Sequence, residues 1–494
     1  MRRVSIKDTL SGEQVALEPD REVGIYACGP TVYSRIHIGN ARPFVIFSLL
    51  ARFLREEGYR VRLVINVTDV NDKIYTAARA AATGEDTAGA ATEATAEAAA
   101  GAAGGSARYA AEMTAAYVAD TDRLGLGRPD AEPLATESID AIVAMIEALI
   151  GSGHAYRSGD DVYYRVAGFE GYGKLSNRRP EDMDQGEEAG TAELKESPLD
   201  FALWKAHKPD EDTSWDSPWG PGRPGWHIEC SAMAAAELGP EFAIHGGGSD
   251  LVFPHHENEI AQSEAAHGVA PARVWMHNGM IETDSAKMSK SEGNIFQLSE
   301  ALDRYGPEAV LAYLTSGHYR QPLAFGPEAL EAAVARVARF RNFFAARDLD
   351  PAAKDAGDPA ADSGNPRAGD PAAGDAVAAR ADEEFRAALA DDFNTPRAWA
   401  AAADLLVAAN RGEAPRAGAV LVEMLRSLGL ESVAARAGGG VGPDAEAEEL
   451  LRERELARAA REFARADALR DELAARGWEV RDSADGAHLV PGAG

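Results

Sequence analysis

The sequence predicts an α/β fold organised around a parallel β-sheet. Residues 23–28 (V-G-I-Y-A-C) and 60–69 (R-V-R-L-V-I-N-V-T-D) have the composition of strands, and a helical pattern that ends at Gly58 lies between them. The apolar positions of that helix are Phe44, Phe47, Leu50 and Leu54. Two strands joined by a helix in this way are parallel. Strand patterns at 242–245 (F-A-I-H) and 274–277 (V-W-M-H) extend the same sheet.

Polar residues fall where the first strands end, which is where parallel sheets bind ligands. Cys28, His37 and Thr68 lie at or just beyond these ends. The segment H-I-G-N begins at His37 and opens the helix, where N–H groups and the helix dipole favour phosphate. Gly39 would let a flat ring approach the backbone, and His37 and Asn40 can donate hydrogen bonds. The alternative is a polar helix start with no ligand.

Residue types that bind zinc gather between W-H-I-E-C and F-P-H-H-E-N-E. Pro254 suits the first position of a helix, so His255 and Glu259 are expected on one helix face. With Cys230 and Cys28, the only cysteines, they make a set of two thiolates, one imidazole and one carboxylate. The alternatives are a surface ion pair and two buried cysteines that act as small hydrophobes. A disulfide is less consistent with the sequence, because nothing indicates an oxidising compartment.

Length and composition exclude several classes of protein. A chain of 494 residues with 45% hydrophobic and 26% charged residues is globular and too long for one core. The N-terminal residues M-R-R-V-S-I-K-D have no apolar signal core, and Ser48 and Arg52 interrupt the longest apolar helix pattern. We therefore expect a cytoplasmic protein with no membrane contact. With 50 basic and 80 acidic residues the net charge is −30, which argues against indiscriminate nucleic-acid binding but allows a specific RNA partner.

Two cationic segments could contact phosphate. The segment K-M-S-K-S places Lys287 and Lys290 three residues apart beside small residues, which suits phosphates whose charge changes during a reaction, although K-x-x-K alone is common. A single C-terminal helix is expected over residues 445–476, with a hairpin after it. Its expected apolar face is Leu456, Phe463, Ala466 and Leu473. The arginines expected on the opposite face are Arg454, Arg458, Arg461 and Arg465. They form either an RNA-binding stripe or a solvated charged face.

Other segments are expected to carry no chemistry. Residues 80–107 are rich in alanine and predict a solvated helix with a loop. Residues 115–195 mix helix and strand patterns and resemble an inserted subdomain, after which the chain should return to the sheet domain around F-A-L-W-K and the tryptophan-rich W-D-S-P-W-G-P-G-R-P-G-W. Helices are expected from Gly326 onward, interrupted by a disordered loop at 350–376 and a linker at 436–445.

Taken together, H-I-G-N after the first strand and K-M-S-K-S after the last resemble the two signatures of class I aminoacyl-tRNA synthetases. Five further segments resemble the cysteinyl branch of that family: Y-A-C-G-P-T-V-Y, N-V-T-D-V-N-D-K, G-R-P-G-W-H-I-E-C-S-A-M, H-G-G-G-S-D-L and F-P-H-H-E-N-E. The resemblance extends from about residue 20 to the C-terminus. Asn40 stands where the signature usually has a second histidine. Since both side chains can donate to phosphate, we expect activity to survive.

The resemblance implies a Rossmann-type catalytic domain with an inserted subdomain, followed by a helical bundle and a small anticodon-binding domain. The expected parts are the first half of the catalytic domain (1–114), the inserted connective subdomain (115–200), the second half with the zinc site (201–282), the K-M-S-K-S loop and stem-contact region (283–325), the bundle (326–435) and the anticodon-binding domain (445–494).

It also implies that ATP and L-cysteine form a cysteinyl-adenylate, from which the acyl group passes to tRNA(Cys). The implied ligands of one zinc ion per chain, which selects the thiol, are Cys28, Cys230, His255 and Glu259. The implied catalytic and ATP contacts are His37, Gly39, Asn40, Gly247, Asp250, Lys287 and Lys290, with magnesium accompanying ATP. The implied contacts to cysteine are Gly29, Thr68, Trp226 and His245. For tRNA we expect the four C-terminal arginines, and for the protein a monomer.

Two rival functions remain at this point. A mycothiol-pathway ligase, which joins cysteine to an amino-sugar, is similar in its catalytic half but lacks the C-terminal anticodon-binding end that residues 445–494 provide here. An inactive paralogue would bind only tRNA or zinc, and the intact K-M-S-K-S segment and ligand set argue against it.

Overall fold

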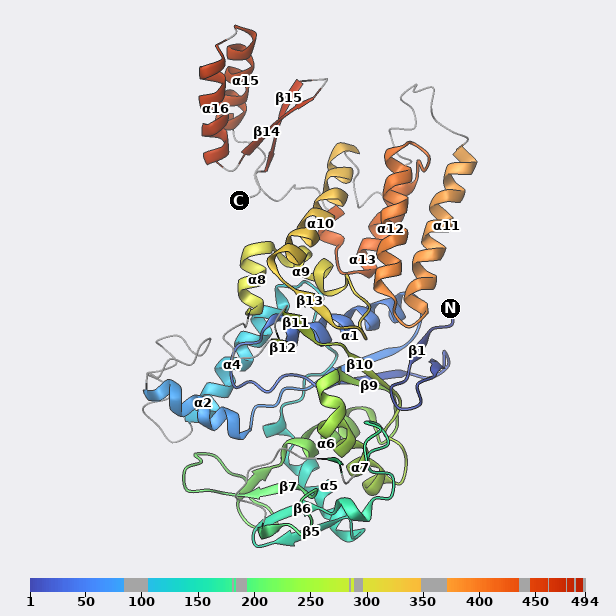
Figure 1. The fold of residues 1–494 in the computed structure, drawn as a ribbon, viewed down its shortest axis with the longest axis vertical. Coiled ribbons are helices and arrows are strands. Elements are labelled where there is room, and N and C mark those ends of the chain that lie inside the picture. The colour runs from blue at the N-terminus through green and yellow to red at the C-terminus, as the bar shows by residue number, and fades with distance from the viewer. Residues whose placement is uncertain are drawn as a thin grey trace. The chain divides into compact units, whose positions relative to one another are not determined.

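The structure is a computed structural model of the chain. It describes residues 1–83, 105–179, 182–183, 193–283, 286–287, 296–347, 371–434, 445–460, 462–476, 478–483 and 486–491. These form a larger unit within residues 1–434 and a smaller unit within residues 435–494 (Figure 1). In the described part of the chain, no helix has the length and apolar character needed to cross a membrane.

A four-stranded parallel sheet forms the centre of the larger unit, as the sequence predicts. The strand order is β10-β9-β3-β4, and each neighbouring pair is parallel. The strands are β3 (Val23–Ala27), β4 (Val61–Ile65), β9 (Phe242–Gly248) and β10 (Ala272–Asn278). The chain goes from β3 to β4 on one side and later adds β9 and β10 on the other side of β3. The sheet therefore has a topological switch point between β3 and β9, where ligands of such sheets bind.

Helix α1 (Ile38–Glu56) connects β3 to β4 and packs on the sheet. Its four predicted apolar residues are all buried. A Cβ atom at Gly246 of β9 would lie 2.2 Å from Cζ of Phe47, so a glycine there lets α1 pack closely against the strand. This close packing holds the N-terminus of α1 near the carboxyl end of the sheet.

At its outer edge β4 bridges Ala131 through Val64, and α2 (Asp72–Thr83) and α4 (Gly105–Asp122), which follow β4 in the chain, pack against each other. The described ends of the alanine-rich segment are helical and belong to these two helices, while residues 84–104 lie outside the description. At the other edge, the hairpin of β1 (Ser5–Lys7) and β2 (Gln14–Ala16) packs against β10.

The inserted region is an antiparallel sheet in the order β5-β6-β7-β8. Its elements are η1 (Ala135–Glu137), α5 (Ile139–Gly151), β5 (Ala155–Ser158), β6 (Asp161–Tyr164), η2 (Val166–Gly168), β7 (Phe201–Ala206) and β8 (Gly222–Pro224). The chain was expected to return to the sheet domain around F-A-L-W-K and the tryptophan-rich segment after it, but F-A-L-W-K forms β7 of the inserted sheet and the chain reaches the parallel sheet only at β9. A short apolar run indicates a buried strand but does not specify its neighbours.

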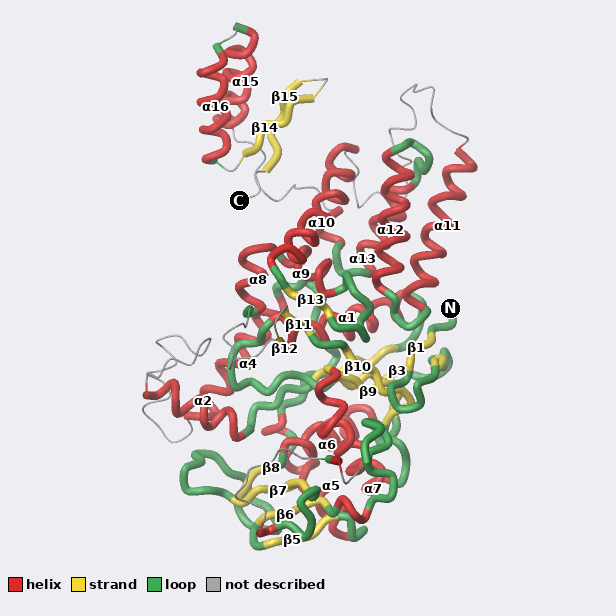
Figure 2. The backbone as a smooth tube through the Cα atoms, viewed as in Figure 1, coloured by secondary structure: helices red, strands yellow, loops and turns green. Residues whose placement is uncertain are grey.

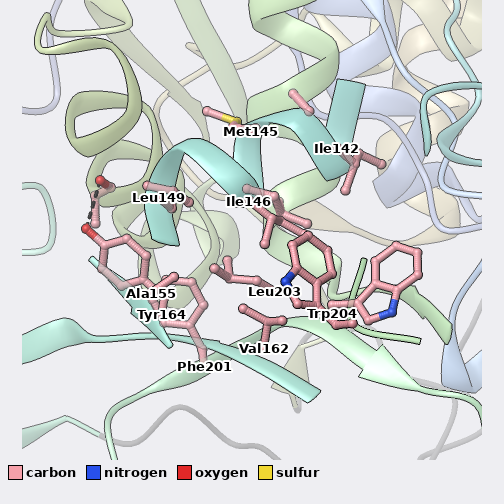
Figure 3. Close-up of a cluster of buried hydrophobic side chains, with 14 of the residues drawn as sticks. Ile142, Met145, Ile146, Leu149, Ala155, Val162, Tyr164, Phe201, Leu203 and Trp204 are labelled. Carbon is pink, nitrogen blue, oxygen red and sulfur yellow. Dashed lines mark hydrogen bonds between the residues drawn. The ribbon is translucent and has the colours of Figure 1, made fainter. Parts of the chain in front are cut away.

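A cluster of buried side chains joins this sheet to α5 (Figure 3). Ile142 and Ile146 of α5 pack over Val162 of β6 and Trp204 of β7, and all four have no exposed surface. The hydroxyl of Tyr164 donates a 2.9 Å hydrogen bond to the carbonyl oxygen of Ala261. That bond connects the inserted sheet to α7 (Glu257–His267), which follows η6 (Val252–His256). The insertion thereby supports the helix that carries Glu259.

The remainder of the larger unit is mainly helical, as Figure 2 shows for α10 to α13. Helix α6 (Trp226–Leu238) lies between β8 and β9 in the chain, and the short helix η5 (Ser249–Leu251) follows β9. A small sheet of β11 (Ile281–Thr283), β12 (Ala286–Lys287) and β13 (Leu323–Phe325) follows, with α8 (Leu298–Tyr305) and α9 (Pro307–Leu314). The bundle is α10 (Pro327–Arg347), α11 (Pro371–Ala390), α12 (Thr395–Asn410), α13 (Ala417–Ser427) and α14 (Glu431–Ala434).

The predicted loop at 350–376 extends too far at its C-terminal end. Residues 371–376 begin α11, because the proline of D-P-A-A suits the first position of a helix as well as a turn. The structure does not describe residues 348–370. It also leaves out residues 436–444 of the linker expected at 436–445.

The smaller unit corrects the expectation of one C-terminal helix. It contains α15 (Ala445–Ala459), α16 (Phe463–Ala475) and the predicted hairpin, formed by β14 (Trp478–Ser483) and β15 (Gly486–Pro491). The two helices pack against each other and bury Ala457, Ala466, Leu469 and Leu473. One straight helix would leave these side chains in water, so folding back is favourable even though no glycine or proline marks the break.

The expected faces of that helix were right in part: Ala466 and Leu473 of the apolar face are buried, whereas the other members and one arginine differ. Leu456 and Phe463 are 66% and 64% exposed, whereas Arg454 is only 6% exposed. Arg458 and Arg465 are exposed, and Arg461 lies outside the described residues. The four arginines therefore do not form a single stripe.

Candidate active site

A buried cluster of metal-binding side chains lies at the carboxyl end of the parallel sheet. Cys28, His255, His256 and Glu259 place one ligand atom each within 4.8 Å of all the others. Glu259 Oε1 lies 3.0 Å from His255 Nε2 and accepts a 3.4 Å hydrogen bond from Cys28 Sγ, and Cys28 Sγ is 3.3 Å from His256 Nε2. Ligand atoms around a tetrahedral zinc ion are about 3.3–3.8 Å apart. The spacing and the donor types therefore fit zinc.

Cys230 of α6 lies beside this group. It is buried, and Cys28 and His255 shift the pKa of its thiol, so it lies next to the other three predicted ligands although it is not one of the four residues whose donor atoms lie within 4.8 Å of one another. Its sulfur is 3.7 Å from Oδ1 of Asn66. His256 is the donor that the sequence interpretation missed. The doubled histidine of H-H-E was the available signal, and only the fold shows that both rings reach the cluster.

Mutual electrostatics make the cluster receptive to a cation. Burial raises the pKa of Cys28, and the hydrogen bond from Cys28 lowers the pKa of Cys230 to about 6. Burial alone would lower the pKa of His255, but Glu259 and Cys230 raise it to about 10. Burial alone would raise the pKa of Glu259, but His245 and His255 hold it well below its usual value. A buried carboxylate and thiolate therefore share one small volume, which a divalent cation would neutralise.

Aromatic rings fix the orientation of the histidines. The ring of Trp226 stacks on His255 with centroids 4.4 Å apart, and His245 stacks on Trp275 at the same distance. His245 Nε2 is 3.2 Å from Glu259 Oε2. Two residues predicted to contact cysteine, Trp226 and His245, thus lie directly against the cluster.

A series of polar contacts that extends beyond the cluster orients the ring of His256. Its Nδ1 is 2.7 Å from Nε2 of His277, whose Nδ1 is 2.8 Å from the hydroxyl of Thr9. Burial lowers the pKa of His256 well below its usual value and that of His277 to about 3. Both rings are therefore neutral at physiological pH, and such contacts orient a histidine beside a metal.

The other two residues predicted to contact cysteine lie close by, around Asn66. The backbone N–H of Gly29 donates to Asn66 Oδ1 at 2.9 Å, and Asn66 Nδ2 donates to the Thr68 hydroxyl at 3.4 Å. A Cβ atom at Gly29 would lie 1.7 Å from the carbonyl oxygen of Asn66, so only glycine fits there. The Thr68 hydroxyl donates to Glu229 at 3.1 Å. Asn66 and Glu229 were not predicted from the sequence.

The start of α1 has a defined capping structure. His37 is the N-cap, and its Nδ1 accepts a 3.0 Å hydrogen bond from the N–H of Gly39. Asn40 Oδ1 accepts a 3.3 Å hydrogen bond from the N–H of His37, which completes a capping box. A Cβ atom at Gly39 would lie 2.8 Å from the His37 ring. Gly39 therefore makes room for this imidazole, and the accepting Nδ1 leaves the proton of the neutral ring on Nε2.

Segments on both sides of K-M-S-K-S are described, whereas Lys290 lies outside the described residues. Lys287 ends β12, and its backbone lies opposite that of Glu282 in the antiparallel pair of β12 with β11. On the other side, the N–H of Ile38 donates to the carbonyl oxygen of Phe296 at 3.1 Å, and Gln297 pairs with His37. The return of the chain from K-M-S-K-S is thus attached to the start of α1.

The remaining predicted ATP contacts lie at the end of β9. The carbonyl oxygen of Gly247 accepts a 3.2 Å hydrogen bond from Asn278. A Cβ atom at Gly247 would lie 2.8 Å from the Leu251 side chain, so glycine avoids a close contact here. Asp250 is exposed in η5. These residues follow β9 beside the switch point.

The switch-point sheet, the capped start of α1 and the attached K-M-S-K-S flanks define a class I aminoacyl-tRNA synthetase. The fold agrees with two solved structures. Mycobacterium tuberculosis methionyl-tRNA synthetase in complex with methionyl-adenylate gives a TM-score of 0.58 at 14% identity, covering 85% of this chain and 92% of that one. The LeuRS–tRNA–LeuAMS complex of Agrobacterium radiobacter K84 gives 0.56 at 12% identity, covering 83% of each.

Sequence comparison resolves the branch within this class. Residues 14–335 match the model of the class I (C) tRNA synthetase catalytic domain, 384–430 the DALR domain, and 442–488 the cysteinyl-tRNA ligase anticodon binding domain. The cysteine–tRNA ligase of Methylobacillus flagellatus is 43% identical over 492 residues, and that of Azotobacter vinelandii 44% over 497, each covering 98% of both chains. The chain belongs to the cysteine–tRNA ligase family.

Proposed function

We propose that the protein ligates L-cysteine to tRNA(Cys) with ATP, through a cysteinyl-adenylate. The observation that carries this proposal is the buried thiolate, imidazole and carboxylate cluster at the carboxyl end of the sheet, the end from which α1 begins. It puts a thiol-binding group at the same end of the sheet as a helix N-terminus that suits phosphate. The rival mycothiol-pathway function is not favoured, since residues 442–488 match an anticodon binding domain.

For zinc we propose the ligands Cys28, Cys230, His255 and Glu259, with His256 packed beside them. Bound zinc supplies a soft Lewis acid that accepts a thiolate far better than a hydroxyl, and so favours cysteine over serine. The protein keeps the donors dry and oriented, because every one of them is buried. Gly29, Thr68, Trp226 and His245 are the proposed walls of the cysteine pocket.

In the first step we propose that the cysteine carboxylate attacks the α-phosphorus of ATP in line. A carboxyl O–P bond forms while the bond to the β-phosphate oxygen breaks, and pyrophosphate leaves with its electron pair. His37 Nε2, Asn40, Lys287 and Lys290 are the proposed phosphate donors, with Gly39, Gly247 and Asp250 around the nucleotide and magnesium accompanying ATP. In the second step a terminal ribose hydroxyl of tRNA attacks the carbonyl carbon and AMP leaves.

The direct test is aminoacylation of tRNA(Cys) with cysteine or serine, before and after a chelator removes metal. We expect charging with cysteine only, loss of charging after chelation, and recovery with added zinc. Charging of serine at a comparable rate, or full activity without metal, would contradict the proposal. Light scattering on the same sample tests the proposed monomer.

Zinc affinity should weaken as pH falls. Thiols and the His255 imidazole must lose their protons before they can bind metal. Because the pKa values of Cys28 and His255 are both raised, zinc binding near pH 7 should release more than one proton. Isothermal titration in buffers of different ionisation enthalpy measures this release. Release of less than one proton near pH 7 would contradict the assigned ligands.

The corrected geometry of the smaller unit narrows the tRNA proposal to Arg458, Arg461 and Arg465. Arg458 and Arg465 are exposed, whereas the burial of Arg454 makes it a poor phosphate contact. Replacing Arg458 and Arg465 by Ala should weaken tRNA binding and lower its salt slope by about one or two contacts. Cysteine-dependent ATP–pyrophosphate exchange should not change. The matched control is Arg21→Ala, an exposed arginine paired with Glu18, and an unchanged salt slope in the double variant would contradict the assignment.

A further inference from the structure

Arg42 is a buried cation near the start of α1 that has no role in the site described so far. It is 1% exposed. Among the residues that the structure describes, no carboxylate forms an ion pair with it. Burial lowers its pKa to about 10, so the guanidinium still carries its charge at neutral pH. A buried charge without a counter-ion is costly, and an apolar side chain of similar volume would cost less, so stability alone does not account for the charge.

The guanidinium donates only to backbone carbonyl oxygens, and these belong to two other segments of the chain. Nη1 donates to Gly279 at 2.5 Å and to Gln321 at 2.9 Å, and Nη2 donates to His318 at 3.1 Å. A weaker contact of 3.5 Å reaches Met280. One side chain of α1 therefore gathers the residues that precede β11 and the turn that precedes β13.

These contacts connect the two signature segments. Arg42 follows Asn40 by two residues, and Met280 immediately precedes β11. Strand β11 pairs with β12, which ends at Lys287. On the far side of K-M-S-K-S, the backbone bond between Ile38 and Phe296 already attaches the chain to α1. Arg42 supplies the corresponding attachment on the N-terminal side of K-M-S-K-S.

The turn that accepts from Arg42 is itself anchored to the bundle. Asp392 accepts a 2.6 Å hydrogen bond from the Tyr319 hydroxyl and a 2.7 Å bond from Arg320 Nε. The N–H of Gly279 donates to the carbonyl oxygen of Tyr319 at 2.7 Å. The acceptors of Arg42 therefore form one braced unit, and the guanidinium sets where that unit lies relative to α1.

We propose that Arg42 is a positioning residue for adenylation. It holds the backbone on the N-terminal side of K-M-S-K-S, which leads into β11 and β12, at a set distance from the H-I-G-N turn. This inference rests on the proposed function. A guanidinium suits the task because its planar fork of donors fixes direction as well as distance. An apolar side chain could fill the same space but would not orient three backbone carbonyls.

The test compares Arg42→Met and Arg42→Lys with Arg52→Met. Arg52 lies on the same helix but donates to the carbonyl oxygen of Arg426 at 2.9 Å and pairs with Glu431, so it connects α1 to the bundle instead. Cysteine-dependent ATP–pyrophosphate exchange is measured per active site, counted by the burst of adenylate. Transfer of preformed cysteinyl-adenylate to tRNA and the thermal midpoint are measured on the same preparations.

We expect Arg42→Met to lower kcat for exchange by about 10- to 100-fold, while KM for cysteine changes by less than about threefold. Transfer from preformed adenylate should stay near wild type, Arg42→Lys should recover part of the loss, and Arg52→Met should exchange normally. The inference is overturned if exchange by Arg42→Met is within about twofold of wild type, or if transfer or Arg52→Met shows an equal loss. If Arg42→Met does not fold, Arg42→Lys decides by the same limit. Failure of the proposed function is separate, because wild type would then show no cysteine-dependent exchange.

Discussion

Replacing Cys230 by Ser should abolish zinc binding and cysteine activation together. Serine preserves the size of the side chain but offers a hard, weakly acidic oxygen in place of a thiolate. Zinc content should fall from about one ion per chain to a small fraction of that. Cysteine-dependent exchange should fall on the order of 10³-fold, since a metal Lewis acid typically contributes several kcal/mol. Metal analysis and pyrophosphate exchange on the same preparation measure both effects.

The matched control for this change is the next residue on α6. Ser231 is buried and accepts a 2.9 Å hydrogen bond from Gln262, but it is not a metal donor. Ser231→Ala should therefore disturb α6 without removing zinc. Normal zinc content in Cys230→Ser would contradict the ligand assignment.

A second variant separates the two possible donor sets. With Cys230 as the fourth ligand, His256→Asn should keep zinc and lose about 10- to 100-fold in affinity, as is typical for a residue that supports a ligand from outside. Complete loss of zinc in His256→Asn with retention in Cys230→Ser would place His256 among the ligands instead.

Replacing His37 by Ala should lower the rate of adenylation by about 10²- to 10³-fold, the usual cost of removing one donor to transition-state charge. The reason is that Nδ1 caps α1, which leaves the proton on Nε2, the proposed phosphate donor. Alanine also removes the cap, which costs about 1 kcal/mol of stability. Exchange kinetics and thermal unfolding measure the two effects separately.

His37→Asn is the control that separates capping from catalysis. Asparagine is a good N-cap but lacks the second ring nitrogen. This variant should unfold at nearly the wild-type temperature yet adenylate as slowly as His37→Ala. Normal adenylation by His37→Asn would remove the imidazole from the mechanism and leave it a structural cap only.

Much of the catalytic region was predictable because its signals are local. The apolar periodicity of α1 and the short strands around it follow from side chains that alternate between sheet, core and solvent within a few residues. The pair His255 and Glu259 was predictable for the same reason, since four residues of helix bring the two side chains to one face. The residue types of the predicted zinc ligands also indicated their chemistry, because cysteine, histidine and glutamate are all side chains that bind zinc.

Three features could be decided only by tertiary structure. The apolar segment that forms β7 pairs with β6 and β8, although its composition suits any buried strand. The C-terminal pattern folds back into α15 and α16, which buries an apolar stripe that one helix would expose. The same fold buries Arg454, whose place on a helical wheel had suggested solvent. In each case periodicity indicates which face is apolar but not which neighbour covers it.

By itself the sequence determined the parallel sheet, the two signature segments and the identity of the predicted zinc ligands. The tertiary structure decided that His256 joins the donor cluster and that Arg42 spans from α1 to the backbone before β11. The physical reason is distance along the chain. Local patterns report contacts within one or two turns, whereas Arg42 and Gly279 are 237 residues apart and meet only because the sheet and α1 bring them together.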